Sequence, residues 1–108
     1  MVRRLSATDL KAMRDRGDPV TLIDVRQPEE YALARIAGGT LIPMMELPVR
    51  LGEIQPDDGA PVVVYCHHGV RSLKAAYFLA QSGLDNVVSL EGGIEAWSLT
   101  VDPGVPRY

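Results

Sequence analysis

One strand-like run in the sequence ends in the chain's single cysteine and is followed, after a short turn, by a predicted helix. The stretch VVVYCHHGVRS covers residues 62–72 and opens with apolar and aromatic residues, the composition of a buried strand. Between residues 71 and 81 the apolar residues recur at helical spacing, so a packed helix follows. A turn of about five residues must therefore join a buried strand to a helix, which favours a fold that alternates the two.

Shorter apolar runs along the chain extend this alternation. Further strands are predicted at 21–25, 40–42 and 87–88, and further helices are predicted to start after Ser6, to start at Pro28, to cover 44–54 and to cover 94–97. Strands that alternate with helices imply right-handed crossovers and a parallel sheet with helices on both faces. The strand runs lack an in–out alternation, which favours burial on both faces. We therefore expect an α/β fold.

The length of the chain indicates one domain. A chain of 108 residues has enough apolar side chains for a single core. We expect a single small domain over 1–108, with its core at about 4–98 and an irregular C-terminal strap at 99–108, where prolines and a glycine occur.

Charge and composition exclude several classes of partner. A net charge of −3 gives no basic surface for nucleic acid or for an anionic membrane. No apolar run approaches the roughly 20 residues that a membrane-spanning helix needs. The start MVRRLSATDL lacks the apolar segment of a secretion signal. A lone cysteine cannot form an internal disulfide and suits a reducing setting, so we expect a cytoplasmic protein, and a monomer is the default for so small a chain.

The loop after the predicted strand 62–65 has the features of an anion-binding turn. Ligands of parallel sheets bind beyond the carboxyl ends of the strands, which is where Cys66 lies. Gly69 permits a tight reversal, and successive amides in such a turn form a concave nest. The helix that starts near Arg71 adds a positive dipole end. All of these features favour a thiolate at Cys66.

Other interpretations of these residues stay open. Cys66 is alternatively a buried structural cysteine. A zinc site made by Cys66, His67 and His68 is disfavoured, because adjacent side chains point apart and no further cysteine exists, so no metal is expected. Each histidine either protonates a leaving group, attracts an anionic donor or faces solvent. Arg71 either forks onto a sulfonate or carboxylate or is an ordinary first-turn residue.

Three stretches together resemble the rhodanese family of single-cysteine sulfurtransferases. LIDVRQPEEYALARIAGGTLIP (22–43) is similar to the first family signature, VVVYCHHGVRS to the active loop, and LEGGIEAW (90–97) to the second signature. They span about residues 20 to 98, and three motifs in order are more specific than one.

This resemblance implies a fold and a site. It implies a rhodanese-like sheet of about five parallel strands flanked by helices and a persulfide on Cys66, without a cofactor. The amides of the following residues would form the cradle: His67, His68, Gly69, Val70, Arg71 and Ser72. Asp24 and Arg26 are expected to form a structural pair, and Glu30 is expected to be structural as well. Trp97 is expected to pack in the core beneath the active face.

The chain departs from the family in places. Ala34-Arg35-Ile36 stands where the family has Gly-His-Ile, and we expect only a local repacking there. The related cysteine phosphatases place five residues between cysteine and arginine, whereas four intervene here, so the loop suits a sulfur atom. The stretch PMMELPVRL and the tail VDPGVPRY are similar to rhodanese domains fused behind adenylyltransferases that activate ubiquitin-like sulfur carriers.

The function implied is sulfur transfer through a Cys66 persulfide. The expected donors are thiosulfate or a protein persulfide, and the expected acceptors are cyanide, a thiol or a sulfur-carrier protein, with an adenylyltransferase as a further partner. Two alternative functions remain: a docking module without chemistry, and a cysteine-dependent phosphatase or arsenate reductase.

Overall fold

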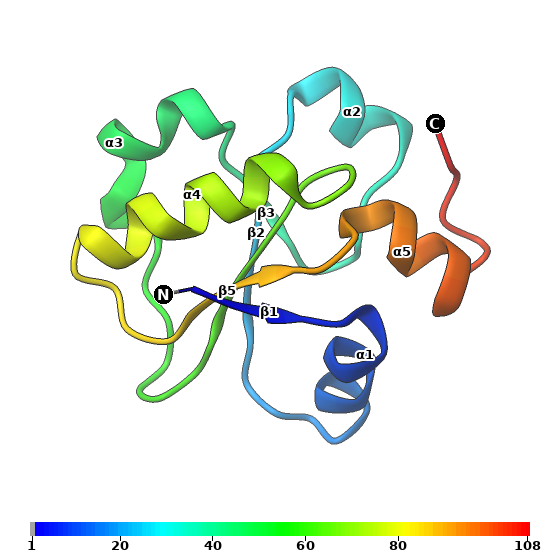
Figure 1. The fold of residues 1–108 in the computed structure, drawn as a ribbon, viewed down its shortest axis with the longest axis horizontal. Coiled ribbons are helices and arrows are strands. Elements are labelled where there is room, and N and C mark those ends of the chain that lie inside the picture. The colour runs from blue at the N-terminus through cyan, green and yellow to red at the C-terminus, as the bar shows by residue number, and fades with distance from the viewer. Residues whose placement is uncertain (1) are drawn as a thin grey trace.

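A computed structural model describes residues 2–108 as one parallel sheet between two layers of helices (Figure 1). The strands are β1 (Arg3–Leu5), β2 (Thr21–Asp24), β3 (Thr40–Leu41), β4 (Val62–Tyr65) and β5 (Val87–Leu90), in the spatial order β1-β5-β4-β2-β3. The α-helices are α1 (Ala7–Asp15), α2 (Pro28–Leu33), α3 (Leu47–Arg50), α4 (Val70–Gln81) and α5 (Gly93–Thr100). Two short 3-10 helices, η1 (Met44–Glu46) and η2 (Leu51–Glu53), flank α3.

The central strand β4 is buried on both of its faces. Val62 and Val64 contribute to the apolar cluster that includes side chains of α3 and α4, whereas Val63 and Tyr65 contribute to the cluster that includes side chains of α1 and α5. Figure 1 shows the two helix pairs on opposite sides of the sheet. Side chains alternate along a strand, so a strand covered on both faces must be apolar throughout. Cys66 continues the alternation on the α4 face and belongs to that cluster.

The α/β class, the parallel sheet and the strands expected from the sequence are confirmed. The N-cap of α1 is also confirmed, because the Ser6 hydroxyl accepts the amide of Asp9 at 3.1 Å. The helix after Cys66 starts at Val70, one residue earlier than predicted. The last helix extends to Thr100, so the strap is shorter than expected and covers 101–108. None of the helices in residues 2–108 is both long and apolar enough to cross a membrane.

The single helix predicted at 44–54 is wrong. The segment divides into η1, a four-residue α3 and η2. Pro48 lies in the first turn of α3, where its missing N–H costs nothing, but it prevents the preceding turn from continuing as one helix. Gly52 lies in η2 and weakens helix formation further.

The sequence of strand β1 does not predict a strand. It contains two arginines and one leucine, and it lies at the edge of the sheet beside β5. Charged side chains are typical of edge strands, and a strand of three residues is too short to show a hydrophobic period. The pairing is nevertheless regular, and beyond it the amide of Glu91 donates to the carbonyl of Leu5 at 2.8 Å.

Candidate functional site

Cys66 lies directly after β4, at the carboxyl edge of the sheet, and the loop that follows closes around its sulfur. The amide of Gly69 donates to Sγ at 3.1 Å, and the amide of Ser72 donates to it at 3.3 Å. The residue is 1 % exposed. One side of the side chain therefore meets peptide dipoles, and the other meets the apolar cluster beneath α4. Two converging N–H groups stabilise negative charge on the sulfur.

The turn depends on Gly69. Its φ of +103° lies in the left-handed region, and a Cβ there would come within 3.2 Å of the amide nitrogen of Gly92. Ser72 fixes the other end of the loop, because its hydroxyl donates to the carbonyl of Gly69 at 3.2 Å. The same hydroxyl lies 2.8 Å from that of Ser89 on β5. The first turn of α4 is thus tied to both the loop and the sheet.

The start of α5 supports the loop from behind. The amide of Ile94 donates to the carbonyl of Cys66 at 2.9 Å, and the amide of Glu95 donates to the carbonyl of His67 at 3.1 Å. Gly93 permits this approach, since a Cβ there would lie 2.4 Å from the Cys66 carbonyl oxygen. The carbonyls at 66 and 67 therefore face α5, while the amides of Gly69 and Ser72 face the sulfur. This packing accounts for Gly93 in the stretch LEGGIEAW, whereas a Cβ on Gly92, at a φ of +75°, would meet Ala96 instead.

His67 forms part of the rim of the site. Its ring stacks on His68, with 3.9 Å between ring centroids, and on Tyr108 from the strap, also at 3.9 Å. Burial, followed by the neighbouring His68, lowers the pKa of His67, so its imidazole is neutral at pH 7. A neutral ring does not attract an anionic donor by charge. His68 is exposed.

Arg71 and Glu30 form a two-point ion pair beside the loop. Nη1 and Nη2 of Arg71 donate to the two oxygens of Glu30 at 2.7 and 2.9 Å. Glu30 also accepts the amide of Gln27 at 3.1 Å and the hydroxyl of Tyr108 at 2.8 Å. The bonds from Arg71 hold the pKa of Glu30 down at about 2, against the opposing effect of burial.

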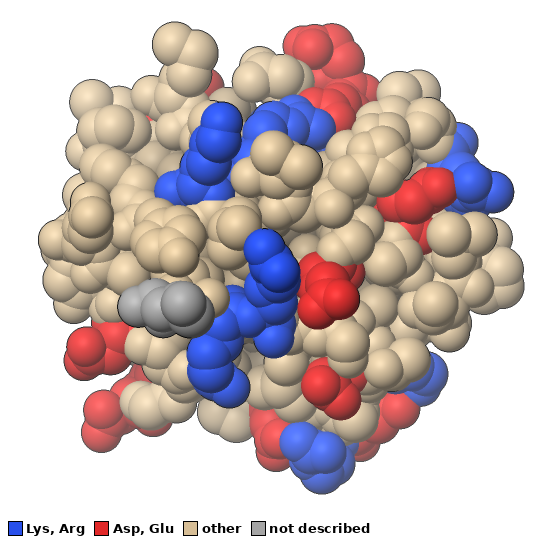
Figure 2. All heavy atoms as spheres, viewed as in Figure 1, with Lys and Arg blue, Asp and Glu red and all other residues tan. Residues whose placement is uncertain are grey.

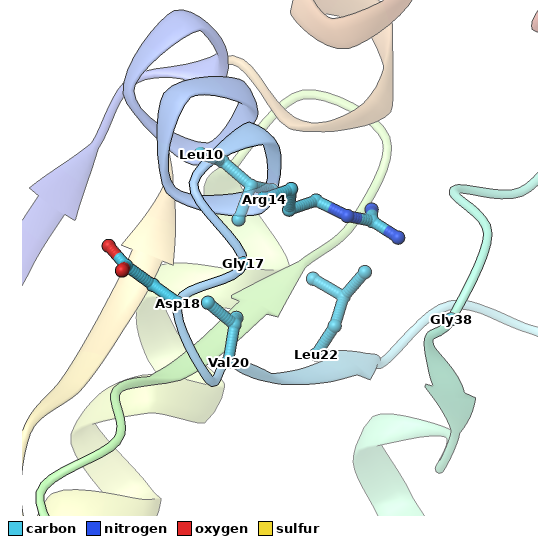
Figure 3. Close-up of a pocket in the computed structure, with 7 residues that line it drawn as sticks. All are labelled: Leu10, Arg14, Gly17, Asp18, Val20, Leu22 and Gly38. Atoms are coloured by element: carbon cyan, nitrogen blue, oxygen red, sulfur yellow. The ribbon is translucent and has the colours of Figure 1, made fainter.

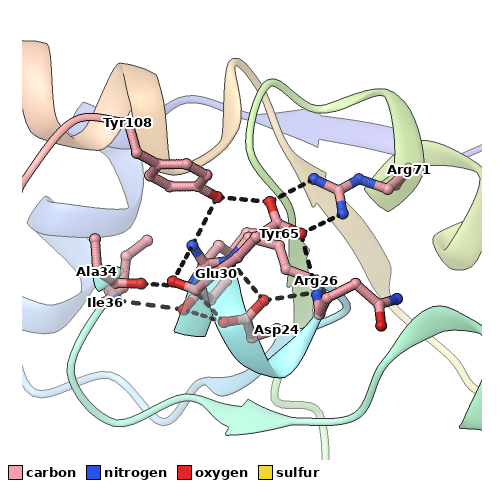
Figure 4. A network of polar contacts seen from close by, with 9 residues as sticks. Asp24, Arg26, Glu30, Ala34, Ile36, Tyr65, Arg71 and Tyr108 are labelled. Atoms are coloured by element: carbon pink, nitrogen blue, oxygen red, sulfur yellow. Dashed lines mark hydrogen bonds and ion pairs between the residues drawn. The ribbon is translucent and has the colours of Figure 1, made fainter. Parts of the chain in front are cut away.

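A second ion pair lies buried behind the first (Figure 4). Arg26 and Asp24 are 0 % exposed and form two parallel bonds, of 2.9 and 2.7 Å. Tyr65 donates its hydroxyl to Asp24 at 2.9 Å, and Arg26 donates to the hydroxyl of Tyr108 at 2.8 Å. Burial lowers the pKa of Arg26, but the bonds to Asp24 and Tyr108 outweigh it and raise the pKa overall. Tyr108 therefore joins the buried pair to the pair at Glu30.

Of the six residues whose amides were expected to form the cradle, two donate to the sulfur in the structure. Gly69 and Ser72 contact the sulfur through their amides, whereas Val70 is 67 % exposed. Arg71 does fork onto a carboxylate, but the carboxylate is that of Glu30. Trp97 is buried in the cluster beneath α1 and α5, as expected of a core residue.

Sequence reasoning misses three contributions to the site. The sequence indicates only a structural role for Glu30, because an acid after Pro28 at the start of a helix has an ordinary capping role. Tyr108 gives no signal, since an aromatic in an irregular strap has no periodic context. Gly93 carries a signal in the Gly-Gly pair, but its contact with the Cys66 carbonyl is a tertiary feature.

Two of the hollows on the described surface bear on the search for a site. One, of about 220 Å³, lies among residues of α1 and the start of β2, and Arg14 extends across it to donate to the carbonyl of Ala37 (Figure 3). None of the residues that line it belongs to the loop 66–72. The other, of about 330 Å³, is lined by residues that include His68, Gly69 and Val70, so it borders the loop.

The face beside this second hollow carries basic side chains. Arg4 and Lys74 line the hollow together with Glu91. Figure 2 shows blue side chains near the centre of the face that carries β1 and α4. Within residues 2–108 the structure contains no cluster of three or more histidine, cysteine or acidic side chains arranged to hold a metal ion.

Comparisons with known proteins identify the family of this chain. The model of the family described as rhodanese-like domain matches residues 6–100. A protein of Allochromatium vinosum named sulfurtransferase is 37 % identical over 98 residues, covering 91 % of this chain and 90 % of that protein. A probable adenylyltransferase/sulfurtransferase MoeZ of Mycobacterium tuberculosis is 33 % identical over 104 residues, and the match covers 96 % of this chain but 26 % of that protein. The crystal structure of a rhodanese-like domain protein from Staphylococcus aureus has a TM-score of 0.83 and 32 % identity, covering 99 % of both chains.

Proposed function

The chain belongs to the rhodanese-like domain family, and we propose that it is a sulfurtransferase that carries sulfane sulfur as a persulfide on Cys66. The observation that carries the proposal is the pair of amides, from Gly69 and Ser72, that donate to the cysteine sulfur. These donors stabilise a thiolate, which is the nucleophilic form of the side chain. They also favour a persulfide, which bears its negative charge one atom further out.

The proposed reaction has two steps. The Cys66 thiolate attacks the outer sulfur of a donor; with thiosulfate, the S–S bond of the donor breaks, a Cys66 persulfide anion forms and sulfite leaves with two negative charges. In the second step an acceptor attacks the outer sulfur. With cyanide, thiocyanate leaves and the thiolate is restored. Atoms and charges balance in both steps, and no external oxidant is needed.

The burial of Cys66 fits a transfer that proceeds through the outer sulfur. At 1 % exposure, the sulfur of the residue itself offers little surface to a large acceptor. A persulfide adds a second sulfur about 2 Å beyond it, and this is the atom that is transferred. Since the chain has a single cysteine, no internal disulfide discharges the intermediate, and the acceptor comes from outside.

A sulfur-carrier protein is a candidate acceptor. The relative from Mycobacterium tuberculosis combines an adenylyltransferase with a sulfurtransferase, and this chain spans about a quarter of its length. We therefore propose a carrier protein or an adenylyltransferase as a partner, besides small donors and acceptors. A cytoplasmic, reducing setting would keep Cys66 available between turnovers.

Mass spectrometry of the intact protein tests the proposal. Incubation of the reduced protein with thiosulfate, or with a thiol persulfide, is expected to add the mass of one sulfur atom to Cys66. Cyanide or a small thiol is expected to remove this mass. If neither donor adds sulfur, Cys66 is no acceptor, and a docking module without chemistry becomes the better account of the fold.

A phosphatase or arsenate reductase has less support. Four residues separate Cys66 from Arg71, and the guanidinium that would bind a phosphate is engaged by Glu30. Turnover of an aryl phosphate that disappears in Cys66→Ser would reverse this preference.

Gly93→Ala is expected to lower the rate of sulfur transfer about tenfold, because the new Cβ would push the Cys66 and His67 carbonyls and move the loop. The measurement is the steady-state rate of thiocyanate formation at equal concentrations of folded protein. Gly83→Ala is the matched control: Gly83 also has a positive φ, of +101°, but a Cβ there would meet nothing within 4 Å. If both variants lose the same share of the transfer rate, the cause is backbone strain and not a clash with the Cys66 and His67 carbonyls.

A further inference from the structure

The one guanidinium in the loop 66–72 is not free to receive a substrate. Arg71 donates through both terminal nitrogens to Glu30, at 2.7 and 2.9 Å. The Glu30 side chain is 19 % exposed and the Arg71 side chain is 35 % exposed. A fork of this kind is the geometry in which arginine binds a sulfonate, so the carboxylate of Glu30 already occupies the position of an anionic ligand.

Glu30 is held firmly in this position (Figure 4). Besides the two bonds from Arg71, its oxygens accept the amide of Gln27 and the hydroxyl of Tyr108. Tyr108 in turn accepts a bond from the buried Arg26 and stacks on His67. A side chain with four donors has no unmet hydrogen-bonding demand, so a competing anion must displace a well-satisfied carboxylate.

A second acid near the loop is also paired. Glu95, in the first turn of α5, pairs with Arg107 at 2.7 Å. The lowered pKa of His67 keeps its ring uncharged at pH 7. The amide dipoles around Cys66 therefore attract an anion, and the guanidinium that could add to this attraction is occupied by the carboxylate of Glu30. Arg4 and Lys74 line the neighbouring hollow beside His68 and Val70, so they add positive charge there, but a donor with a second negative charge must still compete with Glu30 for the guanidinium of the loop itself.

We propose that Glu30, held between Arg71 and Tyr108, is a specificity-determining residue that makes the site select singly charged sulfur donors, such as thiol persulfides, over doubly charged thiosulfate. This inference rests on the proposed sulfurtransferase function. In the favoured reaction, the Cys66 thiolate attacks the outer sulfur of R–S–S⁻, the donor S–S bond breaks, the Cys66 persulfide forms and R–S⁻ leaves. The negative charge is the same before and after this step.

Two small donors that differ by one charge test the proposal. Thiosulfate carries two negative charges, whereas methanethiosulfonate has a methyl group in place of one oxygen and carries a single charge. Both deliver their outer sulfur to Cys66, with sulfite or methanesulfinate as the leaving group. In Glu30→Gln, kcat/KM for thiosulfate is expected to rise roughly tenfold, mainly through KM, because Arg71 is released and the carboxylate charge is removed. For methanethiosulfonate the expected rise is no more than about threefold.

Two further variants separate the release of Arg71 from a general change in charge. Glu95→Gln removes the same unit charge near the loop but leaves the Arg71–Glu30 pair intact, so the ratio of the two kcat/KM values is expected to stay within about twofold of wild type. In the double variant Glu30→Gln/Arg71→Met the gain for thiosulfate is expected to disappear, since the freed guanidinium is absent.

The outcomes distinguish this inference from the function on which it rests. An unchanged donor ratio in Glu30→Gln, or an equal gain in Glu95→Gln, overturns the role of Glu30 while sulfur transfer itself stands. If neither donor places sulfur on Cys66 in any variant, the sulfurtransferase proposal fails first. Circular dichroism and thermal unfolding of each variant show whether the rates refer to folded protein.

Discussion

Cys66→Ser is expected to reduce the formation of thiocyanate from thiosulfate and cyanide by roughly a thousandfold or more, to the rate without enzyme. A serine hydroxyl does not ionise near neutral pH and cannot hold a sulfane sulfur, so both steps lose their covalent intermediate. The amides of Gly69 and Ser72 would still find an acceptor in the serine oxygen, which favours retention of the loop. The measurement combines the steady-state rate with intact mass after incubation with the donor.

Because Cys66 is buried, the variant must be shown to fold. Serine is smaller than cysteine and more polar, and one side of residue 66 meets the apolar cluster beneath α4. A moderate loss of thermal stability is therefore expected, with an unchanged circular dichroism spectrum. Retention of more than about a tenth of the wild-type rate in folded Cys66→Ser would mean that the sulfur travels through another group.

Much of this fold could be predicted because its central strands are buried on both faces. The run at 62–65 is apolar throughout, since alternate side chains enter the two clusters, and the helix after it has a regular apolar stripe. Local sequence was less informative where tertiary contacts decide the structure. β1 forms by pairing with the edge of β5, and its two arginines do not have the apolar composition that predicts a strand.

The centre of the site was also more predictable than its rim. The positions of Cys66 and Gly69 follow from a strand, a tight turn and a helix start, which are local features. The pairing of Arg71 with Glu30 joins residues 41 positions apart, and the bond from Tyr108 to Glu30 spans 78 positions. No periodicity or capping rule reports such contacts, so the sequence alone leaves the partner of Arg71 open.

The segment Ala34-Arg35-Ile36, which departs from the family pattern, contacts the buried ion pair through its backbone. Ala34 and Ile36 are buried, and the Ala34 carbonyl accepts a bond from Arg26 at 2.7 Å. Arg35 is exposed and its guanidinium lies 4.6 Å from the centre of the Tyr31 ring. The backbone of this segment thus accepts a hydrogen bond from the buried ion pair, while the side chain of Arg35 lies at the surface against Tyr31.

Asp24→Asn is expected to lower the free energy of unfolding by about 3 kcal/mol, because it leaves the buried guanidinium of Arg26 without its counter-charge. Asparagine has nearly the same shape, so the loss reflects charge and hydrogen bonding more than packing. For a domain of this size the melting temperature should fall by about 12 °C or more. Urea unfolding followed by circular dichroism gives the free energy directly.

Glu53→Gln is the matched control for this change. Glu53 accepts two bonds from Arg50, at 2.7 and 2.9 Å, so the geometry of the ion pair is similar, but the pair lies at the surface. Water solvates both of its charges whether or not they meet, and a far smaller change in stability is expected. Similar losses in the two variants would mean that water reaches Arg26 and that its burial is not the cause of its effect.

Activity measurements on Asp24→Asn decide whether the buried pair is a scaffold or a catalytic feature. Arg26 contacts Glu30 in two ways: it donates to the hydroxyl of Tyr108, which donates to the Glu30 carboxylate, and it donates to the backbone carbonyl of Glu30 at 3.3 Å. At a temperature where the variant remains folded, we therefore expect its rate of sulfur transfer to stay within about threefold of wild type, despite the large loss of stability. A rate roughly a hundredfold lower than the fraction of folded protein predicts would place Asp24 in the chemistry, because a residue that only positions other side chains is not expected to produce so large a loss.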